Sequence, residues 1–152
     1  MRLASKLRRP RIGWTLEECV RQYGQFSTTE PEEGSYSFRV GNISIVARFL
    51  HGLVGEMTYR KADKSEFTEE EIKVLLHKNG GGRKWKLGIE NQRDQDGNVS
   101  SAWVTNDRSL YAVYTQKSET FPKPFLVIIT AEQHKADKQT SREEAERNLN
   151  GL

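Results

Sequence analysis

The sequence is poor in the residues that build the commonest catalytic and metal sites. It contains one cysteine, Cys19, and three histidines, His51, His77 and His134. A single cysteine excludes an intramolecular disulfide and a zinc site made of cysteines. The histidines lie far apart in the chain, and no serine or cysteine nucleophile motif occurs. We therefore expect a protein that is not an enzyme and that needs no cofactor and no metal.

Long apolar runs are also missing. No segment approaches the length of a transmembrane helix, so we expect no membrane span. The basic start of the chain is not followed by an apolar stretch, as a signal peptide would be. For the chain as given we expect a cytoplasmic location, with the cell envelope as the alternative if a leader has been trimmed. The hydrophobic fraction of 35% and the aromatic fraction of 9% still favour a folded domain.

The charge is mildly basic and unevenly placed. The formal net charge is +3. Five cations stand in the first eleven residues with no acid among them: Arg2, Lys6, Arg8, Arg9 and Arg11. The rest of the chain is close to neutral, so the basic pI describes a terminal arm and not a domain-wide nucleic-acid surface. We predict a flexible basic arm over residues 1–12.

Two helix starts carry the same local signature. Thr15 is followed three residues later by Glu18, and Thr68 is followed by Glu71. A threonine and a glutamate at this spacing form a capping box, in which each side chain bonds the backbone N–H of the other residue. An apolar residue before each threonine, paired with one five positions on, adds a hydrophobic staple. Both sites therefore predict the beginning of a helix.

Apolar spacing extends these two predictions. Residues 16–23 place Leu16, Cys19, Val20 and Tyr23 on one stripe, with Gly24 as the stop, so Cys19 is interpreted as a core residue. The second helix is expected to bury Ile72, Leu75 and Leu76 and to end at Asn79-Gly80.

Alternating apolar residues predict the strands that follow each helix. The expected strands cover 36–40, 43–49, 54–59, 85–89, 102–105, 109–116 and 125–131, and residues 25–35 and 90–98 are expected to form loops. The predicted fold class is α+β, with two tandem helix-plus-three-strand units that form a largely antiparallel sheet with helices on one face. The units span residues 13–62 and 63–131 and make one compact domain. Residues 132–152 form a charged tail, which we expect to be frayed or disordered.

The first unit resembles the SmpA/OmlA (BamE-type) small outer-membrane assembly lipoproteins and the wider group with a β-lactamase-inhibitor-protein-like fold. The resemblance covers roughly residues 13–60. Positions of the family's helix motif are occupied by Gly13, Trp14, Thr15, Glu18, Cys19, Tyr23 and Gly24, and its later strand pattern looks like Ile43, Ile45, Phe49, Gly52 and Val54. The resemblance implies a protein-binding scaffold whose sheet forms a concave surface.

The predicted strands are apolar on both faces. Residues 125–129 and 110–114 carry apolar side chains at consecutive positions, so both faces of these strands need cover. We predict a protein-interaction module that uses an exposed sheet face, with Arg48, Trp103 and Tyr111 as the candidate contacts, because aromatic residues and arginine are typical interface anchors. The partner is another protein of unknown identity, and a homodimer is an alternative.

Two other functions remain open. Arg83, Lys84 and Lys86 follow three glycines and surround Trp85, so they are candidate anion contacts. Together with the basic arm they give the second hypothesis, a binder of nucleic acid or of an anionic surface. Type III secretion chaperones also place helices between blocks of strands, so a chaperone-like binding protein is a further alternative.

Overall fold

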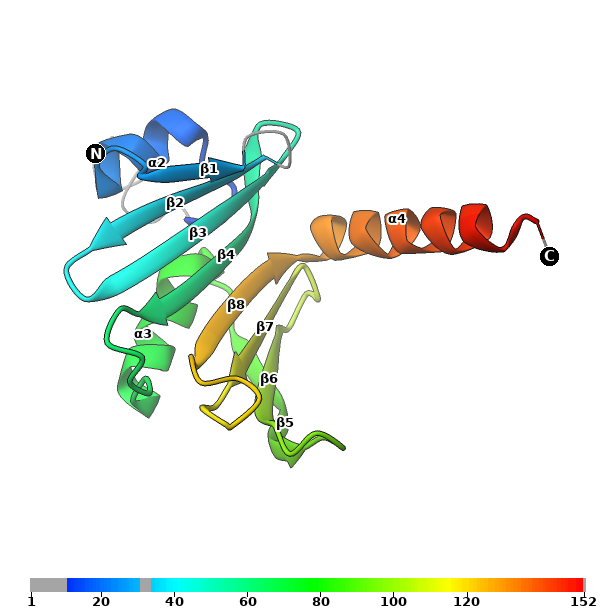
Figure 1. Ribbon diagram of the computed structural model, residues 1–152. Coiled ribbons are helices and arrows are strands. Elements are labelled where there is room, and N and C mark those ends of the chain that lie inside the picture. The colour runs from blue at the N-terminus through cyan, green and yellow to red at the C-terminus, as the bar shows by residue number, and fades with distance from the viewer. Residues whose placement is uncertain (1–10, 31–33, 152) are drawn as a thin grey trace.

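The protein is an α+β fold built on one antiparallel sheet, described here from a computed structural model that covers residues 11–30 and 34–151 (Figure 1). In this part of the chain the elements are, in order, α2 (Leu16–Tyr23), β1 (Thr28–Glu30), β2 (Ser35–Val40), β3 (Ile43–Leu50), β4 (Leu53–Lys61), α3 (Glu69–Gly80), β5 (Trp85–Arg93), β6 (Val99–Thr105), β7 (Leu110–Thr115), β8 (Phe125–Thr130) and α4 (Ala131–Leu149). The predicted α+β class with a largely antiparallel sheet is confirmed.

The eight strands lie in the order β1-β2-β3-β4-β8-β7-β6-β5. Strands β4 and β8 meet at the centre of the sheet, where Met57 pairs with Ile128 and Tyr59 with Leu126. Each of α2 and α3 is followed by four strands, one more than the predicted helix-plus-three-strand unit, although the seven expected segments already placed four after the second helix. The additional strand in the first half is β1, which pairs with β2 inside a segment predicted as a loop. The tandem-repeat interpretation of this order stays a prediction.

Both predicted capping boxes are present. The Thr15 hydroxyl accepts a hydrogen bond from the Glu18 N–H at 3.2 Å, and the Glu18 carboxylate accepts one from the Thr15 N–H at 3.2 Å. The same pair of bonds joins Thr68 and Glu71, at 3.1 and 2.9 Å. Helix α3 ends at Gly80, and the next residue, Gly81, has a φ of 60°, the left-handed conformation that terminates many helices. Local chemistry therefore sets these boundaries, as predicted.

Helices α2 and α3 pack on the same face of the sheet, which we call the covered face (Figure 1). The ring centroids of Tyr23 in α2 and Phe38 in β2 are 5.6 Å apart. The indole N–H of Trp85 in β5 donates to the Leu76 carbonyl of α3 at 2.8 Å. Cys19 is fully buried in this core, as predicted, and burial raises the pKa of its thiol to about 12. The thiol is therefore a packing group and not a nucleophile at neutral pH.

The basic arm begins to pack earlier than predicted. Residues 1–10 lie outside the described part of the chain, but Ile12 is buried at 3% exposure and its N–H donates to the Asn79 carboxamide oxygen at 3.1 Å. The Arg11 guanidinium lies 4.7 Å from the centre of the Trp14 ring. Residues 11 and 12 therefore belong to the folded body, because they contact Trp14 ahead of α2 and Asn79 at the end of α3.

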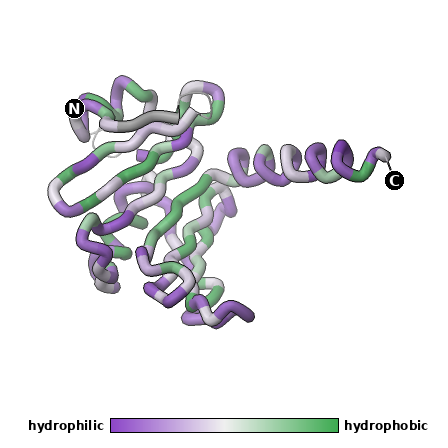
Figure 2. The backbone as a smooth tube through the Cα atoms, viewed as in Figure 1, coloured by the Kyte–Doolittle hydropathy of each residue, from purple (hydrophilic) through white to green (hydrophobic). Residues whose placement is uncertain are grey.

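The charged tail was predicted to be frayed or disordered, and this prediction is wrong. Residues 131–149 form the helix α4. The Thr130 hydroxyl caps α4 by accepting from the Gln133 N–H at 2.9 Å, and no proline or glycine interrupts residues 131–149. Beyond its first turns α4 projects away from the sheet, and its surface is hydrophilic (Figures 1 and 2). Such a helix has no apolar periodicity, so the periodicity that identified the other helices gave no signal here. None of the described helices combines the length and the apolar character needed to cross a membrane.

Candidate functional site: the uncovered face of the sheet

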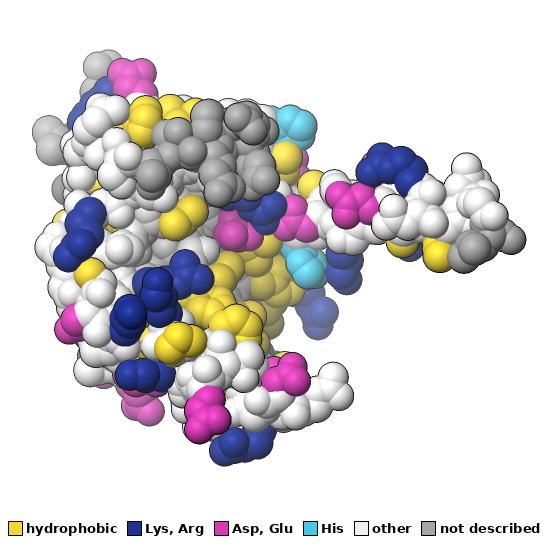
Figure 3. Space-filling model, viewed as in Figure 1, with side chains coloured by type: hydrophobic (Ala, Val, Ile, Leu, Met, Phe, Trp, Pro, Cys, Tyr) yellow, Lys and Arg dark blue, Asp and Glu magenta, His cyan; other side chains and the backbone are white. Residues whose placement is uncertain are grey.

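The face of the sheet opposite α2 and α3 carries an apolar patch, and none of the described helices packs across it. Strand alternation and register place its members, which we call the uncovered patch: Phe125, Val127 and Ile129 of β8, Tyr111 and Val113 of β7, and Ala102 and Val104 of β6. Val113 is 38% exposed. Strands β7 and β8 are mainly hydrophobic along their length in Figure 2, and hydrophobic side chains lie in a hollow beside α4 in Figure 3. The patch is thus an apolar surface formed by the middle of the sheet.

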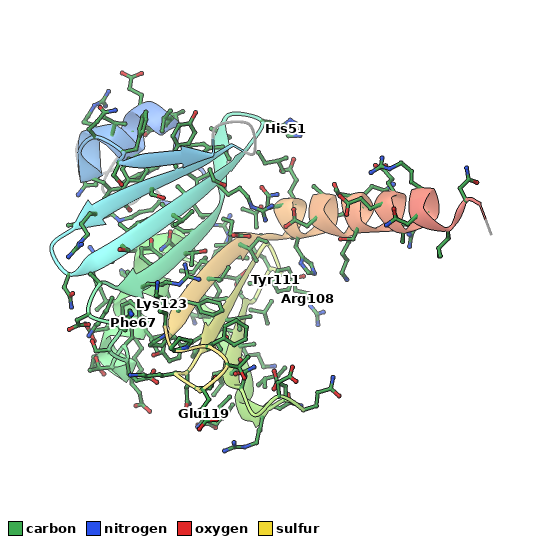
Figure 4. All side chains as sticks on the ribbon, viewed as in Figure 1. His51, Phe67, Arg108, Tyr111, Glu119 and Lys123 are labelled. Carbon is green, nitrogen blue, oxygen red and sulfur yellow. The ribbon has the colours of Figure 1, made fainter. Side chains whose placement is uncertain are left out.

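The first turns of α4 form one border of this patch. The His134 ring lies 5.9 Å from the Tyr111 ring, which is labelled beside the start of the helix in Figure 4. Asp137 accepts two hydrogen bonds from the Arg48 guanidinium, at 2.9 and 2.6 Å. Arg48 also donates to Glu56 at 2.7 Å. The Arg48 bond lowers the pKa of Asp137, so this carboxylate stays ionised at neutral pH.

Cations form another border. The Arg60 guanidinium lies 5.0 Å from the centre of the Phe125 ring, which is cation–π geometry. Arg39 and Lys86 occupy register positions on the same face and are exposed. Among the residues of strands β2 to β8, Glu56 is the one acidic side chain on the uncovered face. Its carboxylate is already paired with Arg48. The uncovered face therefore combines apolar contacts with excess positive charge, and Figure 3 shows Lys and Arg side chains beside the hydrophobic hollow.

The structure separates the three residues predicted to bind a partner. Tyr111 lies in the uncovered patch and is half-buried. Arg48 lies on the same face, but its guanidinium is bound to Glu56 and Asp137. Trp103 lies on the covered face, because it pairs with Ala112, whose side chain is fully buried there. Adjacent residues of a strand point to opposite faces, so an error of one position in register places a side chain on the wrong side.

Sequence reasoning did not select the residues that contribute most to the patch. Phe125, Val127 and Ile129 belong to a continuous apolar strand, whose composition is equally compatible with complete burial. Arg60 could not be selected from the sequence, because its contact with Phe125 joins residues that are distant in the chain. The useful signal was the presence of apolar residues on both faces of β7 and β8.

The three candidate anion contacts do not converge. The Arg83 guanidinium donates to Asp107 at 2.8 Å and to the Gly80 carbonyl at 3.1 Å, so it closes the turn after α3. Lys86 belongs to the uncovered face, and the exposed Lys84 precedes β5. Of the glycines before them, Gly80 is the last residue of α3 and Gly81 is its C-cap.

Two of the acidic side chains make local contacts. The Asp94 carboxylate accepts from the N–H groups of Asp96 and Asn98, both at 2.9 Å, and thereby closes the β5–β6 turn. Glu71 pairs with Lys61 at 2.8 Å. Within residues 11–30 and 34–151, no three side chains of His, Cys, Asp or Glu gather in a group that would hold a metal ion.

The fold and this face define a class of protein: an open antiparallel sheet with helices on one side and an apolar, cationic surface on the other. Comparisons of the chain with known protein families, with curated proteins and with solved structures found no match. The resemblance of residues 13–60 to the SmpA/OmlA lipoproteins therefore stays a prediction.

Proposed function

We propose that the protein is a non-enzymatic interaction module that binds a polypeptide across the uncovered face of its sheet. The observation that carries the proposal is the uncovered patch, where no layer formed by residues 11–30 or 34–151 covers the apolar side chains of β6, β7 and β8. A contiguous apolar surface rimmed by polar groups is a common property of interaction sites. The partner we expect is a segment that presents apolar side chains together with acidic ones.

Charge supports the acidic character of the partner. Arg60 contacts Phe125 of the patch, Arg39 and Lys86 lie on the same face of the sheet, and the acid on that face, Glu56, is paired with Arg48. Complementary charge accelerates association and selects against basic partners, while the apolar patch provides most of the contact energy. Arg48 itself is expected to hold α4 in place and not to contact the partner.

A relationship to the SmpA/OmlA group would agree with this function, because that resemblance implies a protein-binding scaffold. A secretion-chaperone-like role would use the same surface for a similar purpose. A nucleic-acid binder is the second candidate, favoured by the Arg60 guanidinium over the Phe125 ring and by Lys86 on the same face.

The proposal is tested by selecting a displayed library of random peptides against the full chain. The expected peptides combine apolar and acidic residues. Val113→Asp should weaken their binding at least tenfold, since it places a charge in the middle of the patch. Val74→Asp is the matched control, because Val74 is also exposed, at 49%, but lies on α3 at the other side of the sheet. Equal effects of the two substitutions, or a selection of basic peptides, would refute the proposal.

The alternatives give different results in the same samples. A single-stranded oligonucleotide that binds at low salt, with an affinity that falls steeply as salt rises, would favour the nucleic-acid hypothesis. Removing residues 1–10 should then reduce that salt dependence; Arg11 is kept because it packs on Trp14. A dimer that sedimentation detects, and that Val113→Asp dissociates, would identify a second copy of the chain as the partner.

A further inference from the structure

A separate pocket of about 540 Å³ opens on the covered face, between α3 and strands β5 to β7. Its floor is formed by the buried Ile72, Leu76 and Tyr114, and the half-buried Trp103 and the exposed Leu87 add apolar surface at the side. Phe67, labelled in Figure 4 at the start of α3, adds a third aromatic ring. A volume of this size lies within the range of small-molecule sites. The sheet separates the pocket from the uncovered patch, so its ligand is independent of the proposed polypeptide partner.

The rim of the pocket is acidic. Three carboxylates line it, those of Glu66, Glu69 and Glu90, against one ammonium group, that of Lys73. The Lys73 ammonium lies 3.6 Å from Glu70, which partly neutralises it. Across the described parts of the chain, the side chains of Glu69 and Glu90 make no hydrogen bond or ion pair. Two negative charges at the mouth of an apolar pocket are thus left uncompensated.

Glu66 is held in position at one side of the rim. The Tyr114 hydroxyl donates a hydrogen bond to one of its oxygens, and the Lys117 N–H donates to the other at 2.7 Å. Burial of the phenol, followed by its bond to Glu66, raises the pKa of Tyr114, so the hydroxyl remains a donor. These two bonds fix the position of the Glu66 carboxylate before any ligand arrives.

An irregularity in β5 builds the opposite wall. The register of β5 with β6 shifts between Leu87 and Ile89 and again before Gln92. In a regular strand, residues 87 and 90 would point to opposite faces, but here Leu87 and Glu90 both line the pocket. Asn91 adopts a positive φ of 47°. Its N–H donates to the Ser101 hydroxyl at 3.0 Å, and its carboxamide oxygen accepts from Gln116 at 2.9 Å.

We propose that this pocket binds a small organic cation with an apolar or aromatic body. The body would pack on Trp103 and Leu87, and the ammonium group would lie at the carboxylate rim. Aromatic rings attract cations as well as apolar groups, so the floor and the rim favour the same ligand. An anion would be repelled by the rim, and a neutral analogue would gain only the apolar contact.

A matched charge series tests the pocket on the full, unmodified chain. The probes are phenethylammonium, phenethyl alcohol and phenylacetate, which share an aromatic body and differ in charge. Binding is followed in proton–nitrogen NMR spectra through the indole N–H of Trp103, with those of Trp14 and Trp85 as internal references. The ammonium probe should bind at least fivefold tighter than the alcohol, and phenylacetate should bind weakest. This preference should decrease as salt is added.

Variants then assign the charge preference to the rim. Glu69→Gln and Glu90→Gln should each lower the affinity for the ammonium probe about two- to fivefold, which is the effect expected of an exposed ion pair. The affinity for the alcohol should not change. Glu132→Gln on α4 is the matched control and should change neither probe. Equal affinity for the three probes, no change at the Trp103 indole, or equal effects of Glu132→Gln and Glu90→Gln would overturn the proposal. None of these results depends on the polypeptide partner, so the two functional proposals fail separately.

Discussion

Replacing Gly55 with alanine should dislodge α4 from the sheet. A Cβ added at Gly55 would lie 2.5 Å from the Gln133 Oε1 atom, 3.1 Å from its Cβ and 3.2 Å from its Cδ. Gly55 does not have a positive φ, so alanine fits its backbone and only the contact with α4 is affected. The amide end of Gln133 can rotate away, but its Cβ moves only with the helix. The substitution therefore requires α4 to shift.

The loss of stability caused by Gly55→Ala is limited, because α4 is held to the sheet by few contacts. Overpacking a tight contact costs roughly 1–3 kcal/mol when the surroundings cannot move. Here the helix can lift instead, which gives up the partly exposed Arg48–Asp137 ion pair, typically worth up to about 1 kcal/mol, and the packing of Gln133. We therefore expect Gly55→Ala to cost about 1–2 kcal/mol of unfolding free energy in chemical denaturation. Hydrogen exchange in the first turns of α4 should become roughly 5–30-fold faster.

A second substitution checks the mechanism. Gln133→Gly removes all three contacts, including the one with Cβ that requires the helix to move. Gly55→Ala should then cost less in the Gln133→Gly background, with a coupling of at least about 0.5 kcal/mol. If the two changes are additive, or if exchange rises equally throughout the protein, the contact between β4 and α4 does not hold the helix.

Three further predictions concern stability. Leu76→Ala should cost about 2–5 kcal/mol in chemical denaturation, because Leu76 is 4% exposed between α3 and the sheet; a neutral result would contradict this packing. Thr68→Ala should cost about 1 kcal/mol through the lost cap of α3, and unchanged stability would mean that the box contributes nothing. The bond from Arg48 lowers the pKa of Asp137 in the folded state. The ion pair therefore adds to the free energy of unfolding above the unfolded pKa of about 4, and this contribution is lost as the pH falls through the folded pKa. Wild type should therefore be more stable than Asp137→Asn at pH 6, and denaturation curves at pH 3 should show a smaller difference.

Local sequence was sufficient to predict a helix or strand where the interactions that form it span only a few residues. Both capping boxes join residues three apart, so Thr15 and Thr68 identify their helices without knowledge of the fold. Strand alternation identified most strands for the same reason. It missed β1, whose three residues carry no apolar alternation and are paired only because β2 lies beside them.

The candidate site depended on contacts that the sequence does not reveal. Register decided that Tyr111 faces the uncovered side and Trp103 the covered one, and register follows from pairing between distant strands. The bulged β5 brought Glu90 to the same pocket as Glu66 and Glu69 of the α3 start, which strict alternation would not predict.

By itself the sequence determined the class of the fold, the two capped helices and the presence of more apolar strand surface than two helices can cover. Tertiary structure alone decided which face is left open, that Ile12 is part of the core, and that the polar tail is a helix bordering the open face. The physical reason is the range of the interactions. Caps and periodicity act within a few residues, whereas the Ile12–Asn79 and Arg48–Asp137 bonds join residues that only the folded sheet brings together.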